Sequence, residues 1–440
     1  MQHAFGADDN ARFAGSLEYR EGALQHLAFG VSSTPRALQR PAAVVIATAE
    51  EALLTDIDGN RYVDFALGYG PLILGHSPRP VMNAIQSELA KGLRTASVHL
   101  GEAELADLLA ECVPSAEQSS FVSTGTEAVQ LALRIARAAT GKVKIVKFRA
   151  NYHGWFDNVN VASSLGDDGP ATLGQDPHAA DSVVRLDWGD GHALEQTLDS
   201  SFAAVLVEPA AINAGCFEPP AGFLERLRAA TKRHGVVLIF DEIITGFRLA
   251  LGGAQERYGV TPDLSVLGKA LGAGLPIGAV CGTRQVMETI ANGRLVHRGT
   301  FNGNPLSVAA SIACVKHLRA GRDVFYPRLD RFATDIRTHI NAEAARADVA
   351  LYARQAGAAV QIFAGVRTLD EIGDIAKTDK NRTLEFTAEL LRSGVFTLPR
   401  GLMYISTAHT EMDIAVTKKA ITEAMVRFAG QNGACRSPHA

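Results

Sequence analysis

The sequence predicts an α/β fold, with a large domain built on a mostly parallel sheet flanked by helices and a smaller α+β domain. Between residues 119 and 240, short apolar segments alternate with helical ones, which is the pattern of parallel strands joined by helical crossovers. From Leu306 onward the pattern changes to long helical segments followed by short strands. The 440 residues also exceed the roughly 250–300 that one hydrophobic core usually supports.

The elements follow from periodicity and from helix and turn signals. Residues 1–40 are expected to form a lead-in helix and a loop, and Asp58-Gly59 lies between two alternating segments as a hairpin turn. Gly141 is the expected helix stop, and the tail from Gly430 to Ala440 is expected to be loose. The predicted strands are 119–123, 144–148, 203–207 and 236–240, and the predicted helices are 126–139, 222–234, 307–319, 326–345 and 411–428.

Composition and charge narrow the class of protein. Hydrophobic residues make up 47% and charged residues 20%, an ordinary balance for a soluble globular protein. The net charge of −4 offers no basic surface for a nucleic acid, and the longest apolar runs are too short to span a bilayer. No basic, apolar leader is visible at the start, and the five scattered cysteines favour free thiols in a reducing cytoplasm.

A candidate anion site lies at residues 123–127 (STGTE), where a strand ends and a helix begins. Free backbone N–H groups and the helix dipole favour an anion there. Gly125 allows a ligand to approach the backbone closely, and Thr126 adds a hydroxyl donor. The alternative is an ordinary helix N-cap.

Asp241 ends an apolar strand, at the edge where open α/β sheets bind ligands. A carboxylate at this position can hold a ring N–H as a charged pair. The alternative is a helix cap or an ion pair at the end of the sheet.

Lys269 stands in an apolar, glycine-rich stretch, residues 264–276 (LSVLGKALGAGLP). Desolvation lowers the pKa of a lysine and favours the neutral amine, which attacks carbonyl groups. Without this context, a lone lysine is usually solvated.

An aromatic side chain, Tyr152, follows the predicted strand 144–148 and is placed to stack on a heteroaromatic ring. His153 beside it is expected to be structural, because no second His or Cys stands at metal-ligand spacing. A phosphate cradle, a ring-nitrogen carboxylate, a stacking aromatic and a buried amine are together the protein parts that pyridoxal 5'-phosphate (PLP) requires.

Taken together, these motifs resemble the class III aminotransferases of PLP fold type I, in the branch of the glutamate-1-semialdehyde aminomutases and β-amino acid aminotransferases. The similarity runs from Gly30 to Ile414. It is carried by residues 70–76 (GPLILGH), 123–128 (STGTEA), 152–155 (YHGW), 241–248 (DEIITGFR), 267–269 (LGK) and 299–305 (GTFNGNP).

The resemblance implies a role for each matching residue. Lys269 would form the Schiff base with PLP and shuttle the proton, and Asp241 would keep the pyridinium nitrogen protonated. The cofactor-binding residues would be Gly125 and Thr126 at the phosphate, Tyr152 on the ring, Glu208 and Asn213 near the ring and its 3'-oxygen, and Thr300 at the phosphate of a neighbouring subunit. The active enzyme would therefore be a homodimer with shared active sites.

The resemblance also implies a domain organisation. Residues 1–60 would pack with the small domain, residues 61–305 would form the large PLP-binding domain, and residues 306–440 the C-terminal small domain.

Two arginines bear on the substrate. Residues 30–37 (GVSSTPRA) are similar to the aminomutase substrate loop, which puts Ser33 and Arg36 at carboxylate-binding positions. Residues 398–404 (LPRGLMY) depart from the aminomutases and resemble the β-amino acid aminotransferases, where the arginine, here Arg400, binds the carboxylate of the 2-oxo acid.

The predicted function is a PLP-dependent aminotransferase acting between a carboxylate-bearing amino acid, such as a β-amino acid, and a 2-oxo acid. The alternatives are a glutamate-1-semialdehyde 2,1-aminomutase, a decarboxylase or epimerase on the same fold, and a cofactor-binding protein without turnover. The intact Asp241 and Lys269 argue against the last of these.

Overall fold

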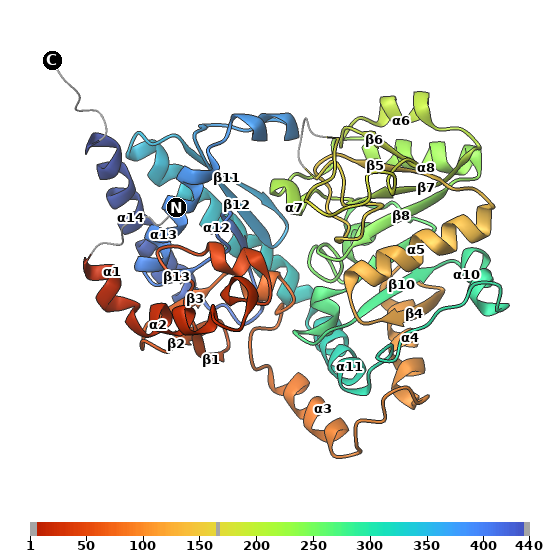
Figure 1. Cartoon of the computed structure of the whole chain (residues 1–440), viewed down its shortest axis with the longest axis horizontal. Helices are drawn as coiled ribbons and strands as arrows, with labels where there is room; N and C mark the ends of the chain where they lie inside the picture. The colour runs from red at the N-terminus through yellow and green to blue at the C-terminus, as the bar shows by residue number, and fades with distance from the viewer. Residues whose placement is uncertain (1–6, 164–167, 435–440) are drawn as a thin grey trace. The chain divides into compact units, whose positions relative to one another are not determined.

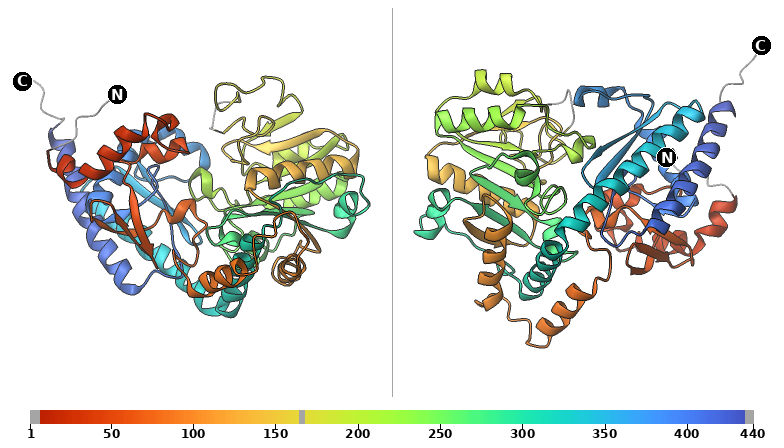
Figure 2. Two further views of the ribbon diagram at one scale, coloured as in Figure 1. Left: turned by 60° about the horizontal axis from the view of Figure 1, so that its bottom comes forward. Right: turned by 180° about the vertical axis from the view of Figure 1, so that it is seen from behind.

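The structure is a computed structural model that describes residues 7–163 and 168–434. The described chain forms two compact units (Figures 1 and 2). Unit 1 combines both chain ends, and unit 2 contains the large sheet. Unit 1 comprises residues 7–69, 74–77 and 328–434, and unit 2 comprises residues 70–73, 78–163 and 168–327.

These units differ from the expected domain ranges at two places. Residues 61–69 and 74–77 lie in unit 1, because strand β3 (Arg61–Asp64) pairs with strands of that unit. Residues 306–327 lie in unit 2, where helix α11 (Pro305–Ala320) packs against α3 and α4.

Unit 2 is built on a seven-stranded sheet in the order β4-β10-β9-β8-β7-β5-β6. The strands are β4 (Gln118–Val122), β5 (Lys144–Phe148), β6 (Val183–Leu186), β7 (Phe202–Val207), β8 (Val237–Glu242), β9 (Leu264–Leu267) and β10 (Gly278–Gly282). Four neighbouring pairs are parallel, and only β10 runs antiparallel to both of its neighbours. The predicted mostly parallel sheet is confirmed.

Helices cover both faces of this sheet (Figure 1). Helix α5 (Gly125–Thr140) packs its apolar stripe on the face that carries Ile145 and Ile239, in one buried core. The opposite face carries Phe148, which contacts Phe223 of α8 (Phe223–His234). Helix α5 ends at Gly141 with φ 68°, the left-handed conformation that glycine adopts without strain.

The remaining helices of unit 2 surround this sheet or connect its strands. They are α3 (Arg79–Leu89), α4 (Leu100–Cys112), α6 (Gly191–Thr197), α7 (Ile212–Gly215), α9 (Gly253–Tyr258), α10 (Arg284–Ala291), α11 and the 3-10 turn η4 (Lys269–Gly272).

Unit 1 contains two smaller sheets, ordered β1-β2-β3-β13 and β11-β12-β14. The strands are β1 (Ile46–Glu50), β2 (Leu53–Asp56), β3, β11 (Leu351–Ala356), β12 (Ala359–Ala364), β13 (Val395–Phe396) and β14 (Leu402–Tyr404). The predicted hairpin at Asp58-Gly59 is confirmed, since β2 and β3 pair antiparallel and Gly59 has φ 83°.

Both chain ends supply the helices of unit 1. They are α1 (Ala7–Arg12), α2 (Ala14–Ala23), η1 (Ala28–Gly30), η2 (Thr34–Leu38), η3 (Leu67–Tyr69), η5 (Ile372–Lys377), α13 (Lys380–Arg392) and α14 (Glu411–Ala434). Helix α12 (Arg322–Arg346) begins in unit 2 and continues into unit 1, starting before the predicted Tyr326. The predicted loose tail is wrong for residues 430–434, which continue α14, and residues 435–440 lie outside the described residues.

Two further findings concern the described ranges 7–163 and 168–434. No helix in them has the length and apolar character needed to cross a bilayer. Four cysteines in these ranges, Cys112, Cys216, Cys281 and Cys314, are buried free thiols.

Candidate active site

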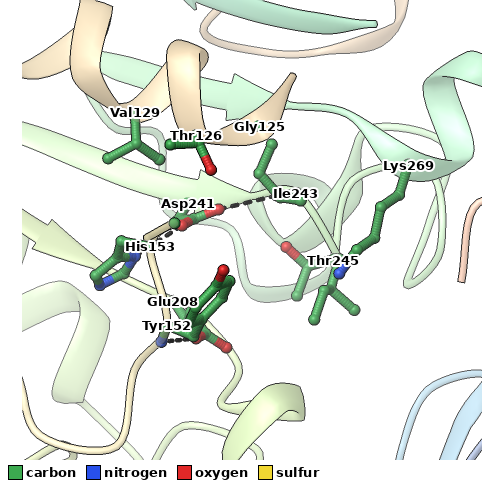
Figure 3. A pocket seen from close by; sticks show the side chains of 12 residues that line it. Gly125, Thr126, Val129, Tyr152, His153, Glu208, Asp241, Ile243, Thr245 and Lys269 are labelled. Carbon is green, nitrogen blue, oxygen red and sulfur yellow. Dashed lines mark hydrogen bonds and ion pairs between the residues drawn. The ribbon is translucent and has the colours of Figure 1, made fainter. Parts of the chain in front are cut away.

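A pocket of about 220 Å³ lies in unit 2, where several parallel strands end (Figure 3). Carboxyl ends of parallel strands meet at one edge of a sheet, so residues far apart in the chain come together there. The predicted site residues that line this pocket are Gly125, Thr126, Tyr152, Glu208, Asp241 and Lys269.

The N-terminus of α5 forms one wall of the pocket. Thr124 caps this helix, with its Oγ1 accepting from Glu127 N at 3.2 Å, while Glu127 Oε2 accepts from Thr124 N at 2.9 Å. Thr124 is therefore a helix N-cap, which was the alternative to an anion site for residues 123–127. The cap is compatible with an anion site, because Gly125 and Thr126 still line the pocket.

Two glycines allow close packing at this wall. A Cβ on Gly125 would lie 3.0 Å from Ile243 Cδ1, and a Cβ on Gly154 would lie 2.8 Å from Thr126 Oγ1. Gly154 also has φ 101°, which disfavours any side chain. Neither position can take a side chain unless the neighbouring atoms of Ile243 or Thr126 shift.

Asp241 is buried on β8 and is fixed by two hydrogen bonds (Figure 3). Its Oδ1 accepts from Ile243 N at 3.1 Å, and its Oδ2 lies 2.7 Å from His153 Nδ1. Burial lowers the pKa of His153, against the opposing effect of the Asp241 carboxylate. A neutral imidazole donating to this carboxylate carries its proton on Nδ1.

His153 makes a contact that the sequence does not predict. The expected structural role fits its bond to Asp241, and the side chain also lines the pocket. Its Nε2 is buried and has no hydrogen-bond partner among the described residues. The one signal in the sequence was its place beside Tyr152.

Glu208 follows β7 and is a second buried carboxyl group in the pocket. Burial raises its pKa to about 8, the Asp241 charge adds to the rise, and a hydrogen bond from Tyr152 N at 2.6 Å opposes it. The positive charge of Lys269 and the backbone N–H of Asn213 also lower this pKa. Asn213 lies on α7 and contributes its backbone to Glu208.

Lys269 is half-buried at the start of η4, directly after β9. Its φ of 43° is unusual for a residue with a side chain, and such strain persists where the surrounding structure fixes the backbone. In Figure 3 its side chain reaches the pocket from the side opposite His153.

Five predicted site residues do not line this pocket: Asn213, described above, and the four that follow. Thr300 lies in unit 2 and is exposed, outside the pocket. Ser33, Arg36 and Arg400 lie in unit 1 and are exposed.

The two arginines of unit 1 act electrostatically on one side chain, Tyr69. Burial raises the pKa of Tyr69, and the charges of Arg36 and Arg400 both act to lower it. Arg400 stands in a tight turn, with Gly401 N donating to Leu398 O at 2.8 Å and Gly401 at φ 86°.

Comparison with known proteins identifies the family. The family model "Aminotransferase class-III" matches residues 35–429. A curated relative from Roseiflexus castenholzii, glutamate-1-semialdehyde 2,1-aminomutase, is 39% identical over 410 residues, covering 90% of this chain and 93% of the relative.

Solved structures with similar folds include aminotransferases. An ω-transaminase from Sphaerobacter thermophilus shares 31% identity at a TM-score of 0.85, over 94% of this chain and 98% of that one. A β-phenylalanine aminotransferase from Variovorax paradoxus shares 29% identity at a TM-score of 0.84, over 97% and 96%. A transaminase with PLP bound shares 27% identity at a TM-score of 0.85, over 95% and 99%.

The residues of the pocket fit PLP. The α5 N-terminus, where Gly125 and Thr126 line the pocket, suits the phosphate, and the buried carboxylate of Asp241 suits a protonated ring nitrogen. Tyr152 offers an aromatic face, and Lys269 offers an amine to the aldehyde. The chain belongs to the class III aminotransferase family, whose members are PLP-dependent enzymes.

Proposed function

We propose that this chain is an aminotransferase that moves an amino group from a carboxylate-bearing amino acid, such as a β-amino acid, to a 2-oxo acid. The observation that carries the proposal is the exposed Arg400 in its tight turn, with a second exposed arginine, Arg36, in the same unit. The carboxylate of a β-amino acid lies one carbon further from the reacting centre than that of a 2-oxo acid. Two separate arginines suit an enzyme that binds both in turn.

The pocket residues are assigned as follows. Bound PLP supplies an aldehyde and a ring that withdraws electrons from the substrate carbon. Lys269 Nζ removes the proton from that carbon and returns it at a later step. Asp241 binds the protonated ring nitrogen, and His153 holds the Asp241 carboxylate in place. These assignments are supported by the position of all three in one pocket.

The remaining contacts hold the cofactor in position. Gly125 and Thr126 bind the phosphate, Tyr152 stacks on the ring, and Glu208, with Asn213 behind it, lies near the 3'-oxygen. The bond from Tyr152 N to Glu208 supports a joint placement of these two residues.

A second candidate is a glutamate-1-semialdehyde 2,1-aminomutase. The name of the curated relative, at 39% identity, favours it over the aminotransferase. The turn at residues 398–404, where Arg400 stands, favours the aminotransferase. Both candidates use Ser33 and Arg36 for a carboxylate, so Arg400 distinguishes them.

The two candidates are separated by assaying the purified, PLP-loaded protein with both kinds of substrate. We expect a β-amino acid with 2-oxoglutarate or pyruvate to give amino-group transfer. We expect Arg400→Gln to raise KM for the 2-oxo acid by roughly 10- to 100-fold, the effect of losing a charged hydrogen-bond pair.

Arg367→Gln is the matched control for this assay. Arg367 is an exposed arginine of unit 1 that pairs with Asp348, and its loss should leave KM unchanged. Efficient conversion of glutamate-1-semialdehyde to 5-aminolevulinate, with no transfer to either 2-oxo acid, would instead establish the aminomutase.

We further propose that the active form is a homodimer in which Thr300 completes the phosphate site of the partner subunit. The exposure of Thr300 and of the large apolar side chains Leu93, Val98, Leu100 and Phe301 in unit 2 supports a surface covered by a second copy.

The buried thiols support the expected location of this protein in the reducing cytoplasm.

Mixed dimers test the shared site. In a dimer of one Thr300→Ala chain and one Lys269→Ala chain, one pocket has its own Lys269 and receives Thr300 from the other chain. We expect that pocket to bind PLP with the wild-type Kd and to turn over normally. If every pocket in the mixed dimers shows the weakened Kd of Thr300→Ala, then Thr300 does not act across subunits.

A further inference from the structure

A lysine with no place in the proposed chemistry is buried against the segment that carries Tyr152 and His153. Lys147 lies on β5 and is 0% exposed, between the buried Val146 and Phe148. Lysines are almost never fully buried unless they are paired, because removing the charge from water is costly. The burial of the Lys147 side chain therefore requires an explanation.

The contacts of Lys147 fix the segment that lines the pocket. Its Nζ donates to Asn151 O at 3.2 Å and to Val161 O at 2.5 Å. These two carbonyl groups bracket the stretch that carries Tyr152 and His153. One ammonium group thus ties the two ends of this segment to the strand.

Lys147 also interacts electrostatically with ionisable groups at this segment. Burial lowers the pKa of Lys147 to about 8, the Glu208 carboxylate opposes this shift, and Arg185 on the neighbouring strand adds to it. The Lys147 charge also acts to lower the pKa of His153, the partner of Asp241.

Glu208 holds the segment from its other side. Its Oε1 accepts from Tyr152 N at 2.6 Å, and its own N donates to Asn151 Oδ1 at 3.0 Å. Lys147 binds the carbonyl of Asn151, so a buried cation and a buried carboxyl group hold the C=O and the N–H of the same peptide group, the one that joins Asn151 to Tyr152.

We propose that Lys147 is a positioning residue of the PLP site. It holds the segment from Asn151 to Val161 in place so that Tyr152 and His153 contact the cofactor. Its positive charge also acts electrostatically on His153 and Glu208. The inference rests on the proposed function, since it requires PLP in this pocket. It adds a residue that touches neither cofactor nor substrate.

Lys147→Met tests the proposal, because methionine fills a similar unbranched volume without the charge or the donors. Titration of the apo-protein with PLP gives Kd, and a pH titration of the bound cofactor's absorption gives a midpoint. We expect Kd to rise roughly 10- to 100-fold. We expect the midpoint to move to higher pH, because losing a nearby positive charge favours the protonated form of groups in the pocket.

Two companion variants sharpen this test. Lys144→Met makes the same change at an exposed position of the same strand and should alter neither quantity. Lys147→Gln keeps a donor without the charge, so it should shift the midpoint as Lys147→Met does while raising Kd less.

The outcomes separate the two proposals. Wild-type protein that binds no PLP overturns the proposed function. If the wild-type protein binds PLP and both Lys147 variants keep its Kd and its midpoint, this inference alone is overturned. It is also overturned if neither variant folds, because Lys147 would then be required for the fold. A raised Kd with an unmoved midpoint overturns the part assigned to charge.

Discussion

Lys269→Ala is expected to reduce turnover by on the order of 10⁴-fold, the upper end of what a positioned proton-transfer group contributes. Alanine leaves the phosphate wall and Asp241 in place, so PLP should still bind while the proton of the substrate carbon has no acceptor. Single-turnover kinetics with a PLP-loaded variant measures this loss directly.

A small added amine should restore part of the rate to Lys269→Ala, because it can enter the space left by the side chain and accept the proton. The exposed Lys142→Ala is the control and should retain wild-type turnover. Full activity of Lys269→Ala would rule out the assigned role of this amine.

Asp241→Asn is expected to bind PLP but to lose turnover by about 10²- to 10³-fold, the effect of removing one preorganised electrostatic contact in a buried site. Asparagine keeps the size of the side chain and can still accept from Ile243 N. It lacks the negative charge that holds a proton on the ring nitrogen, so the ring withdraws electrons poorly.

The matched control for Asp241→Asn is Asp263→Asn. Asp263 Oδ2 accepts from Leu238 N at 2.7 Å, at the other end of the same strand β8. This change should lower thermal stability and leave the turnover of the PLP-bound protein intact. An Asp241→Asn variant with normal turnover would show that ring-nitrogen protonation does not depend on this carboxylate.

The large sheet was predictable because its strands and helices have strong local signals. Strand β5 coincides with the predicted residues 144–148, and α5 differs from the predicted helix by one residue at each end. Gly125, Thr126, Asp241 and Lys269 could be placed at one site, because each stands at a strand end or helix start that faces the same edge of a parallel sheet.

The role of His153 could not be predicted in the same way. Its hydrogen bond joins residues 88 positions apart, on segments that follow β5 and end β8. Strand β7 lies between β5 and β8 in the sheet. Strand order is set by tertiary packing, so no local pattern around residues 152–155 indicates that His153 reaches Asp241.

The compact units differ from the predicted domain ranges for a similar reason. Strand β3 pairs with β13 from the C-terminal part of the chain, which keeps residues 61–69 in unit 1. A pairing over so long a separation leaves no signal near either strand. Helix α11 looks like the start of a new domain in sequence, yet it packs on α3 and α4 of unit 2.

The most direct measurement is to reduce the purified, PLP-loaded protein with borohydride and to map the modified peptide by mass spectrometry. We expect the cofactor to be fixed to Nζ of Lys269 and to no other lysine. Attachment to another lysine, such as the buried Lys147, or no attachment in protein that turns over substrate, would contradict it.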